Sequence, residues 1–331
     1  MCRTISVTQA GPGPSRGWTV ALIALLAGGC GPGPERGNAP GEPEPSDAQA
    51  VSLLGESLTR SMLDSGSWPL QDSLLAEARA GALESPEDPE PLIWVGRRLG
   101  YLGRYDEAME VFGDGALRFP GDARFLRHRG HRRISVRDFG GAIEDLSVAW
   151  SLVEGQPDQV EPDGLPNALG IPTSTLHSNI RYHLGLAHYL LGDWEEARAA
   201  YQADVDAAVN PDMRVASSYW LYLILRRMGD DVAAGSLLGS IDAEMAIIEN
   251  TAYHQLLLLF KGDLSEEDLL GAGGEATLQG TSTAYGVGAW HLLEGRPERA
   301  RTVFQAIVSE RSQWPAFGYI AAEAELARGT P

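Results

Sequence analysis

The sequence predicts an all-α fold in which antiparallel helix pairs stack into a superhelical solenoid that ends in a capping helix. The main observation is an internal repeat, because a fixed period of roughly 20–50 residues is typical of repeat arrays. Small and apolar residues recur 34 positions apart, as Gly96, Ala108 and Phe112 and then as Gly130, Ala142 and Leu146. A third copy, Gly185, Ala197 and Tyr201, follows 55 positions later, which is one period plus a 21-residue insertion. Two helices cross closely only where one side chain is small, so these glycines and alanines indicate helix crossings.

The repeat divides most of the chain into seven units. They lie near residues 55–88, 89–122, 123–156, 178–211, 215–247, 248–280 and 281–314, and a capping helix is expected at Trp314–Ala327 because solenoids need terminal caps. The first and sixth units match weakly. In the sixth, Glu267 replaces a small residue and the glycine-rich run 271–274 interrupts the second helix. Gly192 follows a first helix, where a residue without a Cβ can adopt the left-handed conformation that ends it.

The best-preserved copy, YHLGLAHYLLGDWEEARAAY from Tyr182 to Tyr201, resembles a tetratricopeptide repeat (TPR). Gly185 and Ala197 occupy the small positions of that family, and Trp194 and Tyr201 occupy its aromatic positions. The resemblance implies a groove lined by the first helix of each pair, which binds a protein or peptide partner. Two other segments, EPDGLPNALGIPTST and WPAFGYIAAEAELA, resemble an uncharacterised family of bacterial repeat proteins, and this likeness implies no activity.

The first 29 residues are typical of an export signal. They carry Arg3 and Arg16 but no acid, and their apolar run, Trp18–Ala27, is too short to span a bilayer. The run LAGGC that ends at Cys30 resembles a bacterial lipobox, which implies cleavage before Cys30 and lipid attachment to its thiol. An ordinary signal peptide with an incidental cysteine remains the alternative, although free cysteines are rare in exported chains. We therefore expect a lipoprotein of the bacterial cell envelope, facing the periplasm, with a Gly/Pro-rich tether over 30–46 and the solenoid over 47–331.

Composition and motifs argue against several function classes. The chain has 26 basic and 45 acidic residues, a formal net charge of -19, which disfavours nucleic acid as a partner. Its single lysine, Lys261, lies outside any P-loop pattern, and the sequence contains no HExxH, CxxC, GxSxG or GxGxxG. We therefore expect no catalytic residues, no cofactor and no metal. An enzyme remains a less favoured alternative, which would combine an acid of the insertion (Asp158, Glu161 or Asp163) with His177.

Arginines gather in one predicted first helix. Residues 124–137 contain six arginines and two histidines but no acid. The groove-facing positions of the TPR pattern predict a partner-binding set made of Arg97, Arg124, Arg127, His131, Asn179, Tyr182, Tyr219 and Arg226. Arginine binds a carboxylate with two hydrogen bonds, which indicates a partner with an acidic segment or a C-terminal carboxylate. The alternative is that these arginines pair with acids of neighbouring repeats.

The insertion, residues 155–175, carries four prolines. Long loops inside compact domains are usually functional or disordered. We expect an ordered loop that packs over the groove and is anchored by Leu165, Leu169 and Ile171. The groove aromatics leave a second function open, a lipoprotein that binds a small molecule or a saccharide.

Overall fold

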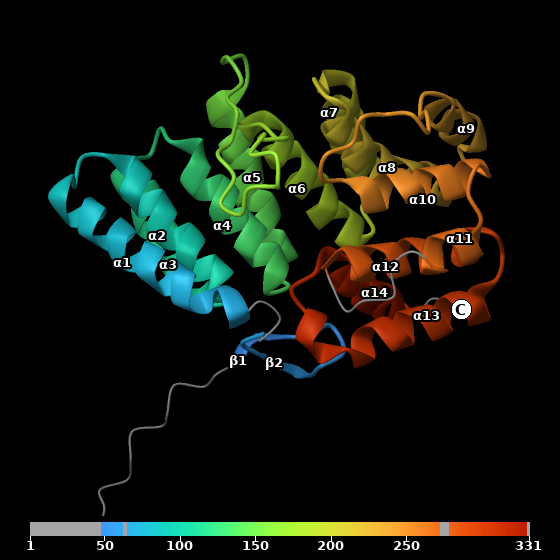
Figure 1. The fold of residues 1–331 in the computed structure, drawn as a ribbon, viewed down its shortest axis with the longest axis horizontal. Coiled ribbons are helices and arrows are strands. Elements are labelled where there is room, and N and C mark those ends of the chain that lie inside the picture. Colours follow the sequence, from blue (N-terminus) through green and yellow to red (C-terminus); the bar gives the residue numbers. More distant parts are fainter. Residues whose placement is uncertain (1–47, 62–64, 272–277, 330–331) are drawn as a thin grey trace, which may run out of the picture. The chain divides into compact units, whose positions relative to one another are not determined.

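A computed structural model describes residues 48–61, 65–271 and 278–329. The export segment, Cys30 and the tether over 30–46 lie outside the described residues. Two short antiparallel strands, β1 (Ala48–Val51) and β2 (Ser57–Thr59), precede the helices. The helices are α1 (Trp68–Glu84), α2 (Pro89–Tyr101), α3 (Tyr105–Arg118), α4 (Ala123–Ser135), α5 (Phe139–Val153), α6 (Leu176–Leu191), α7 (Trp194–Ala207), α8 (Pro211–Arg227), α9 (Asp231–Gly239), α10 (Thr251–Lys261), α11 (Glu266–Gly271), α12 (Leu278–Leu293), α13 (Pro297–Ser309) and α14 (Phe317–Ala327). Consecutive helices pack in antiparallel pairs, which confirms the predicted all-α solenoid (Figure 1).

The repeated glycines lie where the two helices of a pair cross. A Cβ added at Gly96 would stand 2.4 Å from the Phe112 ring, and one at Gly130 would stand 2.7 Å from Leu146 Cγ. The same relation holds later in the chain, because a Cβ at Gly185 would stand 2.7 Å from the Tyr201 ring. The 34-residue period therefore follows from a packing requirement that each pair meets again.

Local sequence sets the helix ends. The Asp122 carboxylate accepts a hydrogen bond from the Arg124 N–H at the start of α4, and Asn210 caps α8 in the same way. Gly192 ends α6 at φ 88°, the left-handed conformation that its position predicts.

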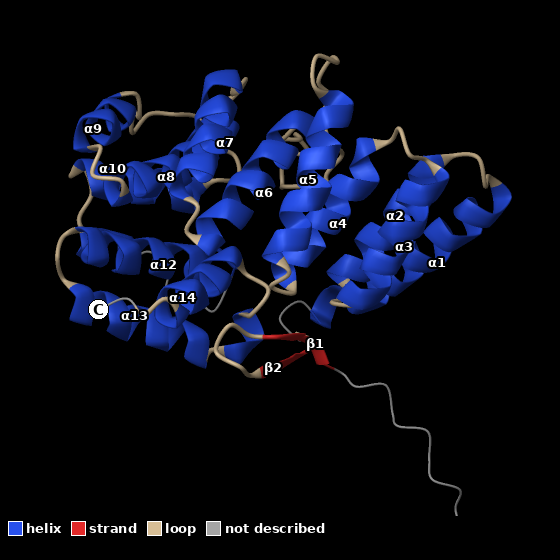
Figure 2. Cartoon of the chain, turned by 180° about the vertical axis from the view of Figure 1, so that it is seen from behind, coloured by secondary structure: helices blue, strands red, loops and turns tan. Residues whose placement is uncertain are grey.

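The two ends of the described unit contact each other. The Trp314 indole N–H donates to the Thr59 carbonyl oxygen over 2.7 Å, and the Trp314 ring meets the edge of Tyr105 at 5.4 Å. Figure 2 shows the hairpin of β1 and β2 beside the C-terminal helices. The predicted capping helix is present as α14, which packs against α12 and α13 and also against α6. Its acid Glu323 forms an ion pair with Arg137, whose Nε lies 2.9 Å from the carboxylate.

The first predicted unit differs from its prediction. The described residues of the range 55–88 contain β2 and one α-helix, α1, where a helix pair was expected. Ser52 and Gly55 form the turn of the hairpin, where Gly55 has φ 84° and the Ser52 hydroxyl accepts from the Leu54 and Glu56 N–H groups. The hairpin occupies the chain as far as Thr59, so few residues remain for a second helix before α1 begins at Trp68. In the described part of the chain, no helix is long and apolar enough to cross a membrane.

Candidate binding face of helices α2 and α4

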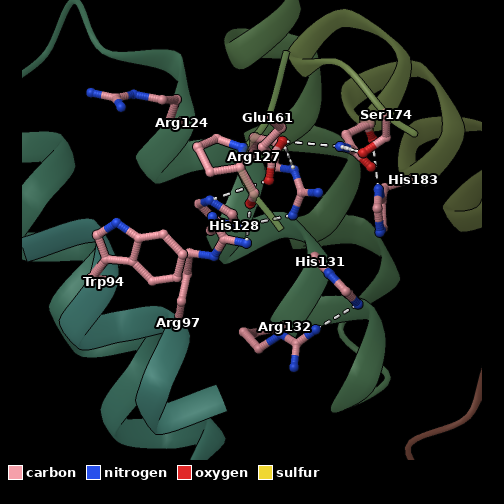
Figure 3. A network of polar contacts seen from close by, with 12 residues as sticks. Trp94, Arg97, Arg124, Arg127, His128, His131, Arg132, Glu161, Ser174 and His183 are labelled. Carbon is pink, nitrogen blue, oxygen red and sulfur yellow. Dashed lines mark hydrogen bonds and ion pairs between the residues drawn. The ribbon is translucent and has the colours of Figure 1, made fainter. Parts of the chain in front are cut away.

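The arginines of α4 divide between two faces of the helix. Arg129 points toward the partner helix α5, where its guanidinium holds the Asp145 carboxylate at 2.6 and 2.8 Å, and Arg133 Nε lies 3.3 Å from the same group. Arg127 and Arg132 point the other way, toward α2 and the insertion (Figure 3). One group of arginines in this helix therefore forms ion pairs with α5, and the other group lies on the inner face, toward α2 and the insertion.

The insertion packs against this inner face. Its Glu161 side chain is buried, with one carboxylate oxygen 3.0 Å from Arg127 Nε and also 3.0 Å from Asn179 Nδ2. The expected apolar anchors are wrong, because Leu165, Leu169 and Ile171 are 58%, 66% and 49% exposed. The ion pair between the buried Glu161 carboxylate and the buried Arg127 guanidinium anchors the loop instead of apolar side chains.

Three histidines lie among these arginines, in surroundings that disfavour the charged form of their rings. Burial, followed by the neighbouring Arg127, lowers the pKa of His128 well below its ordinary value. Burial and then Arg132 do the same for the pKa of His131, and burial likewise lowers that of His183. Arg132 donates to His131 Nε2 over 2.5 Å, so this imidazole accepts a hydrogen bond and carries no charge. A metal cation would find arginines next to these rings, and the described residues contain no three-ligand cluster.

The predicted groove arginines differ in whether a carboxylate lies beside them. Arg124 bonds Asp122 over 2.6 Å and also contacts Glu90 of the preceding repeat. Arg226 lies on α8, away from this face, and pairs with Asp231 at 2.9 Å and Glu294 at 3.2 Å. With the Arg127–Glu161 pair, these contacts match the alternative in which arginines bind acids of the chain itself.

Arg97 differs from them. Its guanidinium donates to the Pro162 carbonyl oxygen over 2.7 Å and lies 4.2 Å above the Trp94 ring. Among the described residues, no carboxylate lies within 4 Å of it. The same holds for Arg132, which was not among the predicted groove residues. Two cations on one face are thus held by neutral groups.

The predicted polar and aromatic groove residues already have partners within the chain. The Asn179 amide donates to Glu161, and the Tyr182 hydroxyl accepts from the Trp220 indole over 2.8 Å. Tyr219 is fully buried and stacks on Tyr253 at 4.7 Å. Tyr219 therefore belongs to the hydrophobic core, and Asn179 positions the insertion.

Sequence reasoning missed a cavity beside this face. It measures about 630 Å³ and is lined by Trp68, Tyr101, Tyr105, Arg132, Tyr253 and Phe317 among others. These residues come from α1, α2, α3, α4, α10 and α14, and only the closure of the array brings them together. The one signal in the sequence was Arg132, within the arginine-rich helix.

The groups considered for catalysis are dispersed. Asp158 accepts from the His177 backbone N–H over 3.0 Å, and its carboxylate stands 3.9 Å from the imidazole. Glu161 is occupied by Arg127. Burial raises the pKa of Asp204 to about 6, and its carboxylate accepts hydrogen bonds from the Ser217 and Ser178 hydroxyls. Its surroundings are those of a buried structural acid.

Comparison with known proteins supports the repeat that the sequence pattern predicted. A family described as tetratricopeptide repeat matches residues 180–203, which span most of α6 and the first part of α7. Among solved structures, "Structure of Naa15/Naa10 bound to HypK-THB" is similar at 14% identity and a TM-score of 0.36, covering 79% of this chain and 37% of that one. No curated protein matches. Tetratricopeptide repeats typically serve as non-catalytic scaffolds for protein partners. The chain is thus an all-α array of helix pairs that contains a tetratricopeptide repeat.

Proposed function

We propose that this protein is a non-catalytic adaptor of the bacterial cell envelope, anchored by a lipid on Cys30. It binds a protein partner by holding an acidic segment or the C-terminal carboxylate of that partner. The binding surface is the rim of the α2–α4 face, formed by Trp94, Arg97 and Arg124.

The observation that carries this proposal is the state of Arg97. The guanidinium is partly exposed, stacks on Trp94 and has no carboxylate within 4 Å among the described residues. Arginine and tryptophan are the side chains most often found at the energetic centre of protein interfaces. A stacked guanidinium is also already oriented, so less side-chain entropy is lost when a carboxylate binds it.

The anchor rests on the sequence. A lipidated Cys30 followed by the Gly/Pro-rich stretch to residue 46 would let the array stand roughly 20–25 Å from the bilayer, the mean reach of a flexible chain of that length. A Cys30→Ser variant should therefore leave the detergent-rich fraction on phase separation, while the unaltered chain stays in it. A variant that partitions like the unaltered chain would rule out this anchor.

The binding surface is tested by charge reversal at a matched pair of arginines. Arg118 on α3 resembles Arg97, because it donates to the Pro86 carbonyl oxygen over 2.6 Å and stacks on Phe119 at 5.4 Å, but it lies outside the α2–α4 face. Arg127 is unsuitable, since reversing its charge would place two carboxylates together in a buried site.

We expect Arg97→Glu to weaken capture of the partner at least about 30-fold, the effect of losing one interface hot spot. Arg118→Glu should leave capture unchanged. The measurement is co-precipitation from envelope extracts, followed by titration of the partner it identifies. Equal losses from both variants would mean that only the net charge matters and that the rim is not the binding surface.

A further inference from the structure

The cavity beside α4 is a separate feature of the closed array. Its volume of about 630 Å³ lies within the roughly 300–1,000 Å³ typical of small-molecule sites. Aromatic rings from five different helices line it, those of Trp68, Tyr101, Tyr105, Tyr253 and Phe317. Such a wall favours an occupant with an apolar body.

Arg132 gives the cavity a charge. The side chain is partly buried, packs against Gly100, and its guanidinium lies 5.2 Å from the centre of the Tyr105 ring. Its one hydrogen-bond acceptor among the described residues is the neutral His131. Burial lowers the pKa of Arg132, which expresses the cost of holding this charge away from water.

The other arginines of α4 make the contrast clear. Arg124, Arg127, Arg129 and Arg133 each have a carboxylate within 4 Å, and so does Arg137 directly after the helix. Arg132 is the member of this series that lines the large cavity, and among the described residues no carboxylate lies within 4 Å of its guanidinium. A buried cation without a counter-charge is costly, and a bound anion would remove that cost.

The wall also contains one carboxylate among its described residues, that of Glu249. Its two carboxylate oxygens accept hydrogen bonds from Asn167 and Thr173 of the insertion. The Glu249 carboxylate therefore already has hydrogen-bond donors from within the chain. The charged end of an anionic occupant would therefore lie at the α4 side of the cavity, next to Arg132.

We propose that this cavity binds a small organic anion, with its carboxylate, phosphate or sulfonate paired to Arg132 and its apolar body against the aromatic wall. This site is distinct from the rim proposed for the protein partner, and it binds its anion whether or not that partner is present. The bidentate geometry of a guanidinium suits all three oxyanions.

Two dyes of the same shape test the proposal on the purified mature chain. Anilinonaphthalene sulfonate carries an anionic group on an aromatic body, and phenylnaphthylamine has the same body without the charge. We expect the protein to bind both, with energy transfer from Trp68 and the other tryptophans. In Arg132→Gln, the affinity for the sulfonate should fall roughly 10-fold or more, the effect of losing a hydrogen-bonded charge. The affinity for the neutral dye should stay the same.

Arg133→Gln is the matched control, because it removes the same charge from the next residue of α4. Arg133 faces Asp145, which retains Arg129 as its partner. This variant should bind both dyes like the unaltered chain. Ala252→Phe fills the cavity from its wall and should lose both dyes. The proposal is overturned if Arg132→Gln keeps its affinity for the sulfonate, or if Arg133→Gln loses as much.

A measurement on the unaltered protein does not depend on how any variant folds. Decanoate and decanol share a chain but differ in charge. Decanoate should displace the sulfonate dye at a concentration at least 10-fold lower than decanol does. Equal displacement by the two would show an apolar cavity that does not use Arg132, and failure of the dye to bind at all would remove the site. Neither result bears on partner capture at Arg97.

Discussion

Replacing Glu323 with leucine should lower the free energy of unfolding by about 3–5 kcal/mol. The Arg137 and Glu323 side chains are 3% and 1% exposed, and Arg137 Nε lies 2.9 Å from the carboxylate. Leucine would leave the guanidinium buried without its counter-charge. Because 186 positions separate the two residues, the pair joins the end of α4 to the last helix of the array.

A double-mutant cycle separates the ion pair from simple packing. Arg137→Met should also cost about 3–5 kcal/mol, since it leaves Glu323 buried and unpaired. It further removes donors from the carbonyl oxygens of Trp314 and Ser135. The double variant contains no unpaired charge, so it should cost much less than the sum of the singles, with a coupling energy of about 2–3 kcal/mol.

The assay is urea unfolding of the purified protein, followed by circular dichroism and by tryptophan fluorescence. Agreement of the two signals tests whether the array unfolds as one unit. A cost under about 1 kcal/mol for Glu323→Leu, or strict additivity in the cycle, would refute the view that a buried ion pair fastens α14 to the end of α4.

Three further predictions concern stability. Gly130→Ala should destabilise the fold by about 1–3 kcal/mol because the new Cβ meets Leu146, whereas Gly140→Ala, which meets nothing within 4 Å, should be neutral or stabilising in the same urea assay. Burial raises the pKa of Asp204 to about 6, above its unfolded value of about 3.9, so the folded state binds the proton more tightly and stability rises as pH falls from about 7 to 4. Asp204→Asn should lose that gain, on the order of 2–3 kcal/mol, in unfolding measured across this pH range; an unchanged pH dependence would assign it to other groups. Arg132→Met should raise the free energy of unfolding by about 0.5–2 kcal/mol, because the charge of a binding residue is costly when its site is empty. A lower free energy of unfolding would instead show that Arg132 stabilises the fold.

Local rules in the sequence were sufficient to predict the helix pairs. Gly96, Gly130 and Gly185 each mark a crossing that any side chain would obstruct, and Gly192 marks a helix end. These constraints act between residues that are close in the chain, so they recur with a period that the sequence displays. The same reasoning predicted an inner face rich in arginine.

Long-range closure was not predictable in this way. The contact between Trp314 and Thr59 and the pair formed by Arg137 and Glu323 join residues that lie far apart in the chain. Neither contact produces a periodic pattern in the sequence. The same limit applies to the binding face. The five arginines of α4 are alike in sequence, but their roles depend on which distant carboxylate each one meets, as Glu161 meets Arg127. Arg97 and Arg132 stand out only once those partners are placed.

Site-specific photo-crosslinking in intact cells gives the most direct test of the proposed adaptor. A photoreactive benzoylphenylalanine at position 97 should form a crosslink to one dominant protein, and mass spectrometry should map that crosslink to an acidic segment or to a C-terminus. The same residue at position 118, outside the α2–α4 face, should not capture that protein. Equal crosslinking from both positions, or none from position 97, would contradict the conclusion that the α2–α4 rim binds a protein partner.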